Sequence, residues 1–231
     1  MSDASLATIL DSAKRVITDP AGFYRSMPQD GGFAAPVIFV LVMAVVSGII
    51  VALLAMLGGG MGAAGVPVGF MAVVMLPIMA LIGSFIGAAI MFVIWKLMGS
   101  ARSFETAYRC VAYAAAIMPI TTLLALIPYL GSIVKVLWSF FLMYVASIEA
   151  HGIKARTAAI VFGVLGALML LLNLSAERAA MQMAEQMGEL GSQMEGLGGS
   201  LEGIEEMSPE EAGKAVGEFM KGLEGAVGQQ R

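Results

Sequence analysis

The sequence has few charged residues and almost no cysteine or histidine. Only 13% of its 231 residues are charged and 59% are hydrophobic, whereas soluble domains are about 25% charged and about 45–50% apolar. This excess of apolar residues is too large for a soluble core, and it predicts a membrane protein. The single cysteine, Cys110, excludes an internal disulfide, and together with the single histidine it provides no spacing typical of a metal site. We expect neither a metal nor a cofactor.

The few charges are unevenly distributed along the chain. Only Lys96 is charged between residues 36 and 99, whereas residues 175–231 contain eleven of the seventeen acids. This pattern predicts a cytoplasmic N-terminal segment at residues 1–35 and a membrane domain at residues 36–174. The remainder is an acidic, Met- and Gly-rich tail, expected outside the cytoplasm.

Residues 1–35 carry charges throughout and lack the apolar core of about 7–15 residues that a secretory signal peptide requires. We therefore expect the first membrane span to act as its own insertion signal. Several apolar residues of the segment fall on one helical face, which predicts an amphipathic helix along the cytoplasmic surface. They are Leu6, Ile9, Leu10, Ala13, Val16 and Ile17.

The chain contains five apolar segments that meet or approach the length of a membrane span. A helix needs roughly 20 apolar residues to cross the hydrocarbon of a bilayer. The segments lie at residues 36–57, 68–95, 110–128, 132–150 and 155–174. Pro77 and Pro119 fall inside the second and third segments and predict helix kinks. The expected fold class is all-α, a polytopic membrane bundle of five transmembrane helices.

Lysine and arginine residues near the span ends predict the orientation of this bundle, because cytoplasmic ends carry an excess of them. Eight lie before the first span, between the second and third, or between the fourth and fifth: Lys14, Arg15, Arg25, Lys96, Arg102, Arg109, Lys154 and Arg156. The opposite side has Lys135 at a span edge and Arg178 beyond the last span. We therefore expect a cytoplasmic N-terminus and an extracytoplasmic C-terminus.

Three stretches of the chain carry a family resemblance. They are DPAGFYRSM at residues 19–27, SFETAYR at 103–109 leading into AYA at 112–114, and IPYLG at 127–131. In their order and in the number of spans, they resemble the Yip-type domain. This family of five-span membrane proteins is named for interaction with Rab-type GTPases, and the resemblance is to its bacterial members. It covers about residues 19–172.

The resemblance implies the same orientation as the basic residues, and it implies the inner membrane of a bacterium as the location. In eukaryotic members the family is associated with vesicle traffic and with binding of prenylated GTPases, whereas bacterial members have no settled activity. Residues 1–35 are shorter than the cytoplasmic segment of eukaryotic members. This departure argues against transferring the GTPase role to this chain.

A cluster of polar side chains precedes the third span: Arg102, Glu105, Tyr108 and Arg109. One interpretation is a catalytic cluster. The alternative is a helix start at the cytoplasmic edge, capped by Ser103, in which Glu105 pairs with a neighbouring arginine. The basic groups would then meet lipid headgroups, and Tyr108 would lie in the interfacial aromatic belt. Each element is common at such an interface, which favours this second interpretation.

A second polar cluster follows the fourth span: Glu149, His151, Lys154 and Arg156. One histidine with one carboxylate could serve acid–base chemistry or half of a metal site. No second histidine exists to complete a zinc site, so the favoured interpretation is a short polar connection between two spans.

Gly83 and Gly87, inside the second span, have the small-xxx-small spacing that lets two helices approach closely. We expect them to pack against another span of the same chain, and a dimer face is the alternative. The spans carry no ionisable residue near their middle, which weakens a proton-coupled transport function. Pro77 and Pro119 leave open a small transporter or channel for a neutral or lipid-like substrate.

Apolar residues of the acidic tail are spaced alternately by three and four positions, which is a heptad seam. They are Ala180, Met183, Met187, Leu190, Met194, Leu197, Leu201 and Ile204. Each glycine from Gly188 onward disfavours a helix by about 1 kcal/mol, so no isolated helix is expected beyond that point. The seam predicts self-association or a protein partner, and a disordered acidic tail is the alternative. A final short helix is predicted to begin near Ser208.

The sequence contains no phosphate-binding glycine loop, nucleophile elbow or paired-carboxylate motif. We therefore expect a non-enzymatic membrane scaffold or recruitment factor in membrane organisation or trafficking-like processes. The expected partners are membrane lipids and an unidentified membrane or peripheral protein, and not nucleic acid. The small transporter or channel is the next alternative, followed by an enzyme that acts on lipid.

Overall fold

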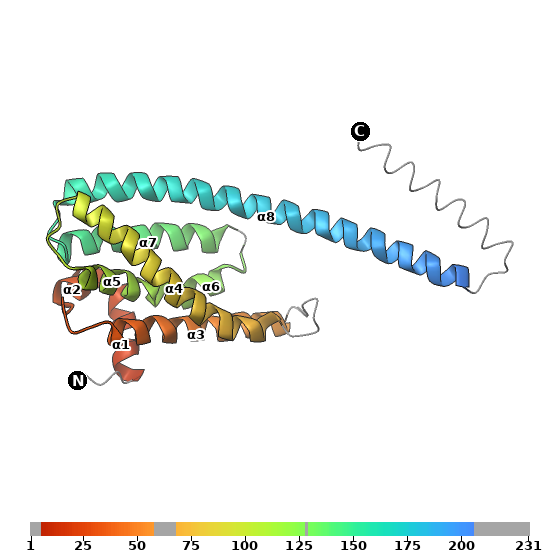
Figure 1. The fold of residues 1–231 in the computed structure, drawn as a ribbon, viewed down its shortest axis with the longest axis horizontal. Helices are drawn as coiled ribbons and strands as arrows, with labels where there is room; N and C mark the ends of the chain where they lie inside the picture. The colour runs from red at the N-terminus through yellow and green to blue at the C-terminus, as the bar shows by residue number, and fades with distance from the viewer. Residues whose placement is uncertain (1–5, 58–67, 128, 206–231) are drawn as a thin grey trace. The chain divides into compact units, whose positions relative to one another are not determined.

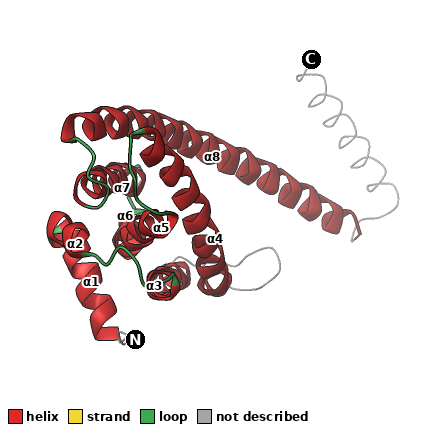
Figure 2. Cartoon of the chain, turned by 60° about the vertical axis from the view of Figure 1, so that its left-hand side comes forward, coloured by secondary structure: helices red, strands yellow, loops and turns green. Residues whose placement is uncertain are grey.

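The described part of the chain is built from helices and their connecting loops (Figure 1, Figure 2). The computed structural model describes residues 6–57, 68–127 and 129–205. The chain divides into two compact units, Met1–Ser175 and Ala176–Arg231.

Two short helices precede the first span, α1 (Leu6–Thr18) and α2 (Pro20–Ser26). They are separated at Asp19, whose side chain accepts a hydrogen bond from the backbone N–H of Gly22 and so caps α2. Proline follows at the first helical position, where its missing N–H costs nothing. Helix α1 lies crosswise to α3 (Figure 1). It turns Ile9, Ala13 and Val16 into the core, whereas Leu6 and Leu10 of the same predicted face are exposed.

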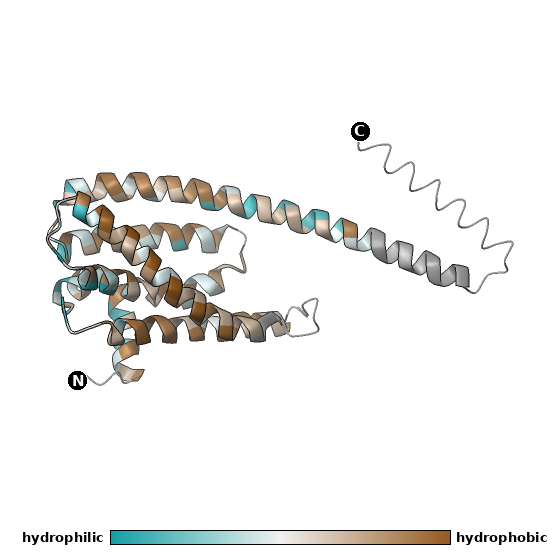
Figure 3. Cartoon of the chain, in the orientation of Figure 1, coloured by the Kyte–Doolittle hydropathy of each residue, from teal (hydrophilic) through white to brown (hydrophobic). Residues whose placement is uncertain are grey.

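Five helical segments are long and apolar enough to cross a membrane: Ala34–Leu57, Met71–Leu97, Phe104–Leu124, Leu130–Glu149 and Ala155–Ser192. They correspond to α3 (Ala34–Leu57), α4 (Val68–Leu97), the α5–η1–α6 segment, α7 (Leu130–Glu149) and the first part of α8 (Ala155–Glu205). The chain is thus a multi-pass membrane protein with an all-α fold, which confirms the predicted class. Figure 3 shows the apolar residues along these helices, with hydrophilic residues gathered where α2 ends and α5 begins.

The third span differs from the predicted residues 110–128. It begins earlier, with α5 (Phe104–Tyr113), continues through the 3-10 turn η1 (Ala114–Ile117) and ends with α6 (Met118–Leu124). Hydropathy alone excluded the polar start of α5. Ser103 caps this start, as one interpretation of the sequence expects, by accepting a hydrogen bond from the backbone N–H of Thr106. Pro119 occupies the first turn of α6, so it restarts a helix after η1.

Two spans approach each other closely at Gly48 of α3, and less closely at Gly83 and Gly87 of α4. A Cβ added to Gly48 would lie only 2.8 Å from the Cα of Val73 in α4, whereas a Cβ at Gly83 would meet nothing within 4 Å. At Gly87 the nearest atom would be a methyl of Val111 at an ordinary 3.7 Å. Gly87 thus lies in ordinary contact with another span, whereas Gly83 faces open space, and the role of the pair in helix packing stays a prediction.

The acidic tail is helical further than its glycines predict. Helix α8 continues past Gly188 to Glu205, because the intervening Met, Glu, Leu and Gln residues are good helix formers that sustain propagation between the glycines. The seam residues Met183, Met187 and Leu190 are exposed. The others, Met194, Leu197, Leu201 and Ile204, also fall within α8. The short helix predicted near Ser208 lies outside the described residues, and self-association of the seam stays a prediction.

Candidate functional site

An arginine clamp holds the loop between α2 and α3. The guanidinium of Arg109 donates from Nη2 to the carbonyl of Gly32 at 2.7 Å and from Nε to Glu105 Oε1 at 3.3 Å. The same carboxylate accepts the backbone N–H of Gly32 at 2.6 Å. Gly31 and Gly32 have φ values of 113° and 83°, which glycine adopts without strain. The three groups close a ring that fixes the entrance to the first span.

The cluster of Arg102, Glu105, Tyr108 and Arg109 is therefore only partly brought together. Glu105 pairs with Arg109, as one predicted alternative has it, while Arg102 donates instead to the carbonyl of Ala150 at 3.0 Å. Arg109 is buried, and Tyr108 is fully buried. Arg109 was expected to meet lipid headgroups, but it is buried and bonds within the bundle instead. Tyr108 was expected in the interfacial aromatic belt, and it is buried as well.

Tyr108 packs deep between α4 and α5. Its ring stacks on Phe85 with centroids 4.3 Å apart, and its hydroxyl lies 3.3 Å from the Ser84 hydroxyl. These contacts place Tyr108 in the helix–helix core.

The second polar cluster does not form an acid–base pair either. Glu149 accepts two hydrogen bonds from Arg25 of α2, at 2.8 and 2.9 Å. These bonds and the carboxylate charge raise the pKa of Arg25. His151 is buried, and its Nδ1 lies 2.8 Å from the Ser100 hydroxyl. Burial, followed by the positive charges of Arg102 and Lys96, lowers the pKa of His151 to about 4, so the ring is neutral at pH 7.

Helix α2 is thus attached to the ends of the spans through several side chains. Besides the Arg25–Glu149 pair, the fully buried Tyr24 donates its hydroxyl to the backbone carbonyl of Cys110 at 3.1 Å. Burial, followed by the charge effect of Cys110, raises the pKa of Tyr24. Phe23 packs edge-on against Tyr113, with the ring centroids 5.0 Å apart. Two of the three stretches that carry the family resemblance, residues 19–27 and 103–114, therefore build one contact region.

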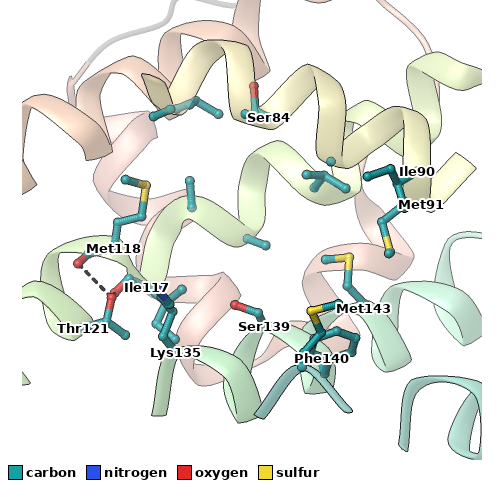
Figure 4. Close-up of a pocket in the computed structure, with 18 of the residues that line it drawn as sticks. Ser84, Ile90, Met91, Ile117, Met118, Thr121, Lys135, Ser139, Phe140 and Met143 are labelled. Carbon is teal, nitrogen blue, oxygen red and sulfur yellow. Dashed lines mark hydrogen bonds between the residues drawn. The ribbon is translucent and has the colours of Figure 1, made fainter. Parts of the chain in front are cut away.

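An apolar cavity of about 550 Å³ lies between the spans. Its walls come from α3 to α8 and consist almost entirely of carbon atoms and methionine sulfurs (Figure 4). Gly83 and Gly87 line it on α4, and Ala114 and Ala115 line it on the facing segment. Small residues on both sides leave space that larger side chains would fill. Sequence reasoning missed this cavity, and the spacing of Gly83 and Gly87 was the signal that could have found it.

Four polar side chains line the cavity: Ser84, Thr121, Lys135 and Ser139. Lys135 is exposed, and it forms no ion pair with any residue that the structure describes. A smaller cavity of about 220 Å³ lies between α1, α2 and α3, with Arg15 and Phe23 in its wall. Within residues 6–57, 68–127 and 129–205, no group of three or more His, Cys, Asp or Glu side chains could hold a metal ion.

These features define a polytopic α-helical membrane protein with a fixed polar end and an apolar cavity between its spans. The model of the Yip1 domain matches residues 14–176, which is most of the chain, and the chain belongs to the Yip1 domain family. The match extends from the last part of α1 into α8, and it confirms the resemblance. Comparison with curated proteins found no match. Comparison with solved structures found none either.

Proposed function

We propose that this Yip1 domain protein is a non-enzymatic membrane scaffold that recruits a peripheral protein to its polar, cytoplasmic end. One observation carries this proposal, namely the attachment of α2 to the span ends through Arg25–Glu149, Tyr24 and the Arg109 clamp. A pre-formed surface loses little entropy on binding, which favours recruitment. The exposed faces of α1 and α2 and the connections beside them form that surface.

A non-enzymatic role is supported by the way the polar side chains are used. The groups that sequence analysis considered for catalysis hold the fold together: Glu105, Arg109, Glu149 and His151 each bond to a neighbouring side chain or backbone group. The contact of the Ser100 hydroxyl with His151 joins a nucleophile to a base, but both residues are buried, which argues against access of a substrate to this pair.

The orientation and location belong to the same proposal. Basic side chains at the polar end favour a cytoplasmic N-terminus, and we propose the bacterial inner membrane as the location. Reporter fusions after Gly60 and after Arg231 should both report the extracytoplasmic side. A cytoplasmic signal from either fusion contradicts this topology.

The recruitment function is tested by photo-crosslinking in intact cells. A photoreactive residue at Asp11 or Lys14, both exposed on α1, should capture the same peripheral protein. The matched control is a photoreactive residue at Leu172, exposed on the apolar part of α8, which should capture none. Loss of the capture in the charge-reversed double variant Asp11→Lys, Lys14→Glu is expected. Equal capture at Leu172 contradicts a recruitment surface on α1.

The cavity favours a second candidate function, a small transporter or channel for a neutral or lipid-like substrate. A space of about 550 Å³ between spans could accept such a molecule, and η1 interrupts the third span beside it. Liposomes that contain the purified protein would show solute flux or lipid scrambling if this function holds. Both activities should then fall in Pro119→Ala, and their absence in the unaltered protein excludes the candidate.

A further inference from the structure

The cavity between the spans has one polar end and one apolar end. Lys135, Thr121 and Met118 lie on one side of the close-up, and Ile90, Met91, Phe140 and Met143 lie on the other (Figure 4). Lys135 and Ser139 are four residues apart on α7, so they share one face of the helix and line the same wall.

The walls of the cavity select an apolar occupant. Water stays in a buried site only where it finds two to four polar partners, and apolar cavities remain dry. An empty cavity leaves its lining atoms without dispersion contacts on one side. The acyl chain of a lipid would restore these contacts, and lipid acyl chains are the apolar groups that surround a membrane span. Several of the lining residues are methionines, whose flexible side chains adapt to irregular apolar partners. They are Met91, Met118, Met143 and Met169.

The charge at the polar end selects an anionic headgroup. Lys135 has no carboxylate partner among the described residues, and an unpaired ammonium inside a span is costly. Lys135 lies five residues after Leu130, the first residue of α7, which is about 8 Å along the helix axis. From that depth a lysine side chain can extend to the headgroup level. The phosphate of a lipid is the anion available there.

We propose that the cavity holds an acyl chain of an anionic phospholipid whose phosphate pairs with Lys135. The acyl chain of the lipid would extend from Lys135 past Ser139 toward Met143, along about 12 Å of α7. The hydroxyls of Thr121 and Ser139 flank the start of this path. The proposal is independent of recruitment and of transport, because a lipid that stays bound performs neither.

Native mass spectrometry of the full chain in mild detergent tests the headgroup. The probes are phosphatidylglycerol and phosphatidylcholine with the same acyl chains. We expect the unaltered protein to retain phosphatidylglycerol preferentially, and Lys135→Gln to reduce this retention about tenfold, which corresponds to about 1.4 kcal/mol. Lys135→Arg should keep the preference. Lys154→Gln is the control, because Lys154 is an exposed charge that does not line the cavity. This variant should retain phosphatidylglycerol as the unaltered protein does. Equal retention of both lipids by the unaltered protein overturns the phosphate pairing.

A cavity-filling variant tests the acyl chain. Gly83→Leu should lose both lipids, because its side chain enters the cavity, and it should fold because a Cβ at Gly83 meets no atom within 4 Å. Gly163→Leu is the matched control, since Gly163 is equally open but does not line the cavity. Circular dichroism checks that each variant is folded. Full lipid retention by folded Gly83→Leu, or a lipid-free dimer of the unaltered protein, overturns the proposal.

Discussion

The indole ring of Trp95 lies flat against the imidazole of His151, with ring centroids 3.9 Å apart and an angle of 19° between the planes. Trp95 comes from the last turn of α4, and His151 follows α7, so the stack joins two distant parts of the chain. The polar atoms of both rings are satisfied. Trp95 Nε1 donates to the Ser147 hydroxyl at 2.7 Å, and His151 Nδ1 bonds to Ser100. A neutral imidazole is therefore built into the polar end of the bundle.

Acidification should destabilise the protein through His151. Its pKa is about 4 in the folded state and about 6.5 when unfolded. Between these values the unfolded chain binds more protons, so the stability that this residue contributes falls as the pH drops from about 6.5 toward 4. We expect a loss of roughly 2 kcal/mol between pH 7.5 and pH 5, because one pKa unit is worth about 1.4 kcal/mol. Unfolding by SDS, followed by tryptophan fluorescence, measures this change.

The matched variant is His151→Phe, which retains an aromatic ring over Trp95 but does not titrate. Its stability should stay level from pH 7.5 to pH 5, a range above the ordinary pKa of carboxyl groups. The same pH slope in His151→Phe and in the unaltered protein would assign the effect to other residues.

Arg109 should be sensitive even to a conservative change. Arg109→Ala leaves the Gly32 carbonyl and Glu105 without their partner, and we expect a loss of about 2–3 kcal/mol in the free energy of unfolding. Arg109→Lys keeps the charge but not the forked geometry that reaches both acceptors, so a smaller loss is expected. The exposed Arg156 is the control, because Arg156→Ala should change stability little. Equal stability of the Arg109→Ala and Arg156→Ala variants would show that the clamp is dispensable.

Limited proteolysis distinguishes the local effect of this clamp from global unfolding. In Arg109→Ala the loop around Gly31 and Gly32 should be cleaved before the rest of the chain, because its backbone is no longer held. If other parts of Arg109→Ala are cleaved as fast as this loop, the clamp has no local role.

The spans were predictable from sequence because long apolar runs determine them, and α3 agrees closely with the expected residues 36–57. Hydropathy placed the start of the third span at residue 110, whereas α5 begins at Phe104, after the Ser103 cap that one interpretation of the sequence expects. The cavity and the stacking of Trp95 on His151 depend on contacts between segments far apart in the chain. A single sequence gives the periodicity of a helix but not which neighbour each face meets, so Gly83 was assigned to packing and Gly48 was overlooked.

Gly48 should tolerate no side chain, in contrast to Gly83. A methyl group at Gly48 would lie 2.8 Å from the Val73 Cα and 3.0 Å from the Ala72 carbonyl oxygen. Both are backbone atoms, so α3 and α4 would have to separate. We expect Gly48→Ala to cost about 1–3 kcal/mol, the range for overpacking a core. Gly83→Ala has open space and removes a poor helix former, so it should be neutral or stabilising. Equal loss of stability in the two variants contradicts the observed packing of α3 on α4.

The single cysteine makes opening of the polar end directly measurable. Cys110 is fully buried, and its sulfur lies 3.8 Å from His151 Nε2. A water-soluble maleimide should therefore label it only after the protein is unfolded in SDS. As a control, Lys154→Cys in a Cys110→Ser background places the only thiol at an exposed position, where labelling should be immediate.

Tyr24→Ala removes the hydroxyl that bonds to the Cys110 carbonyl and the ring that helps hold α2 in place. Labelling of Cys110 in folded Tyr24→Ala should then be faster than in the unaltered protein, because α2 detaches more often. An unchanged labelling rate would mean that α2 does not control access to the thiol.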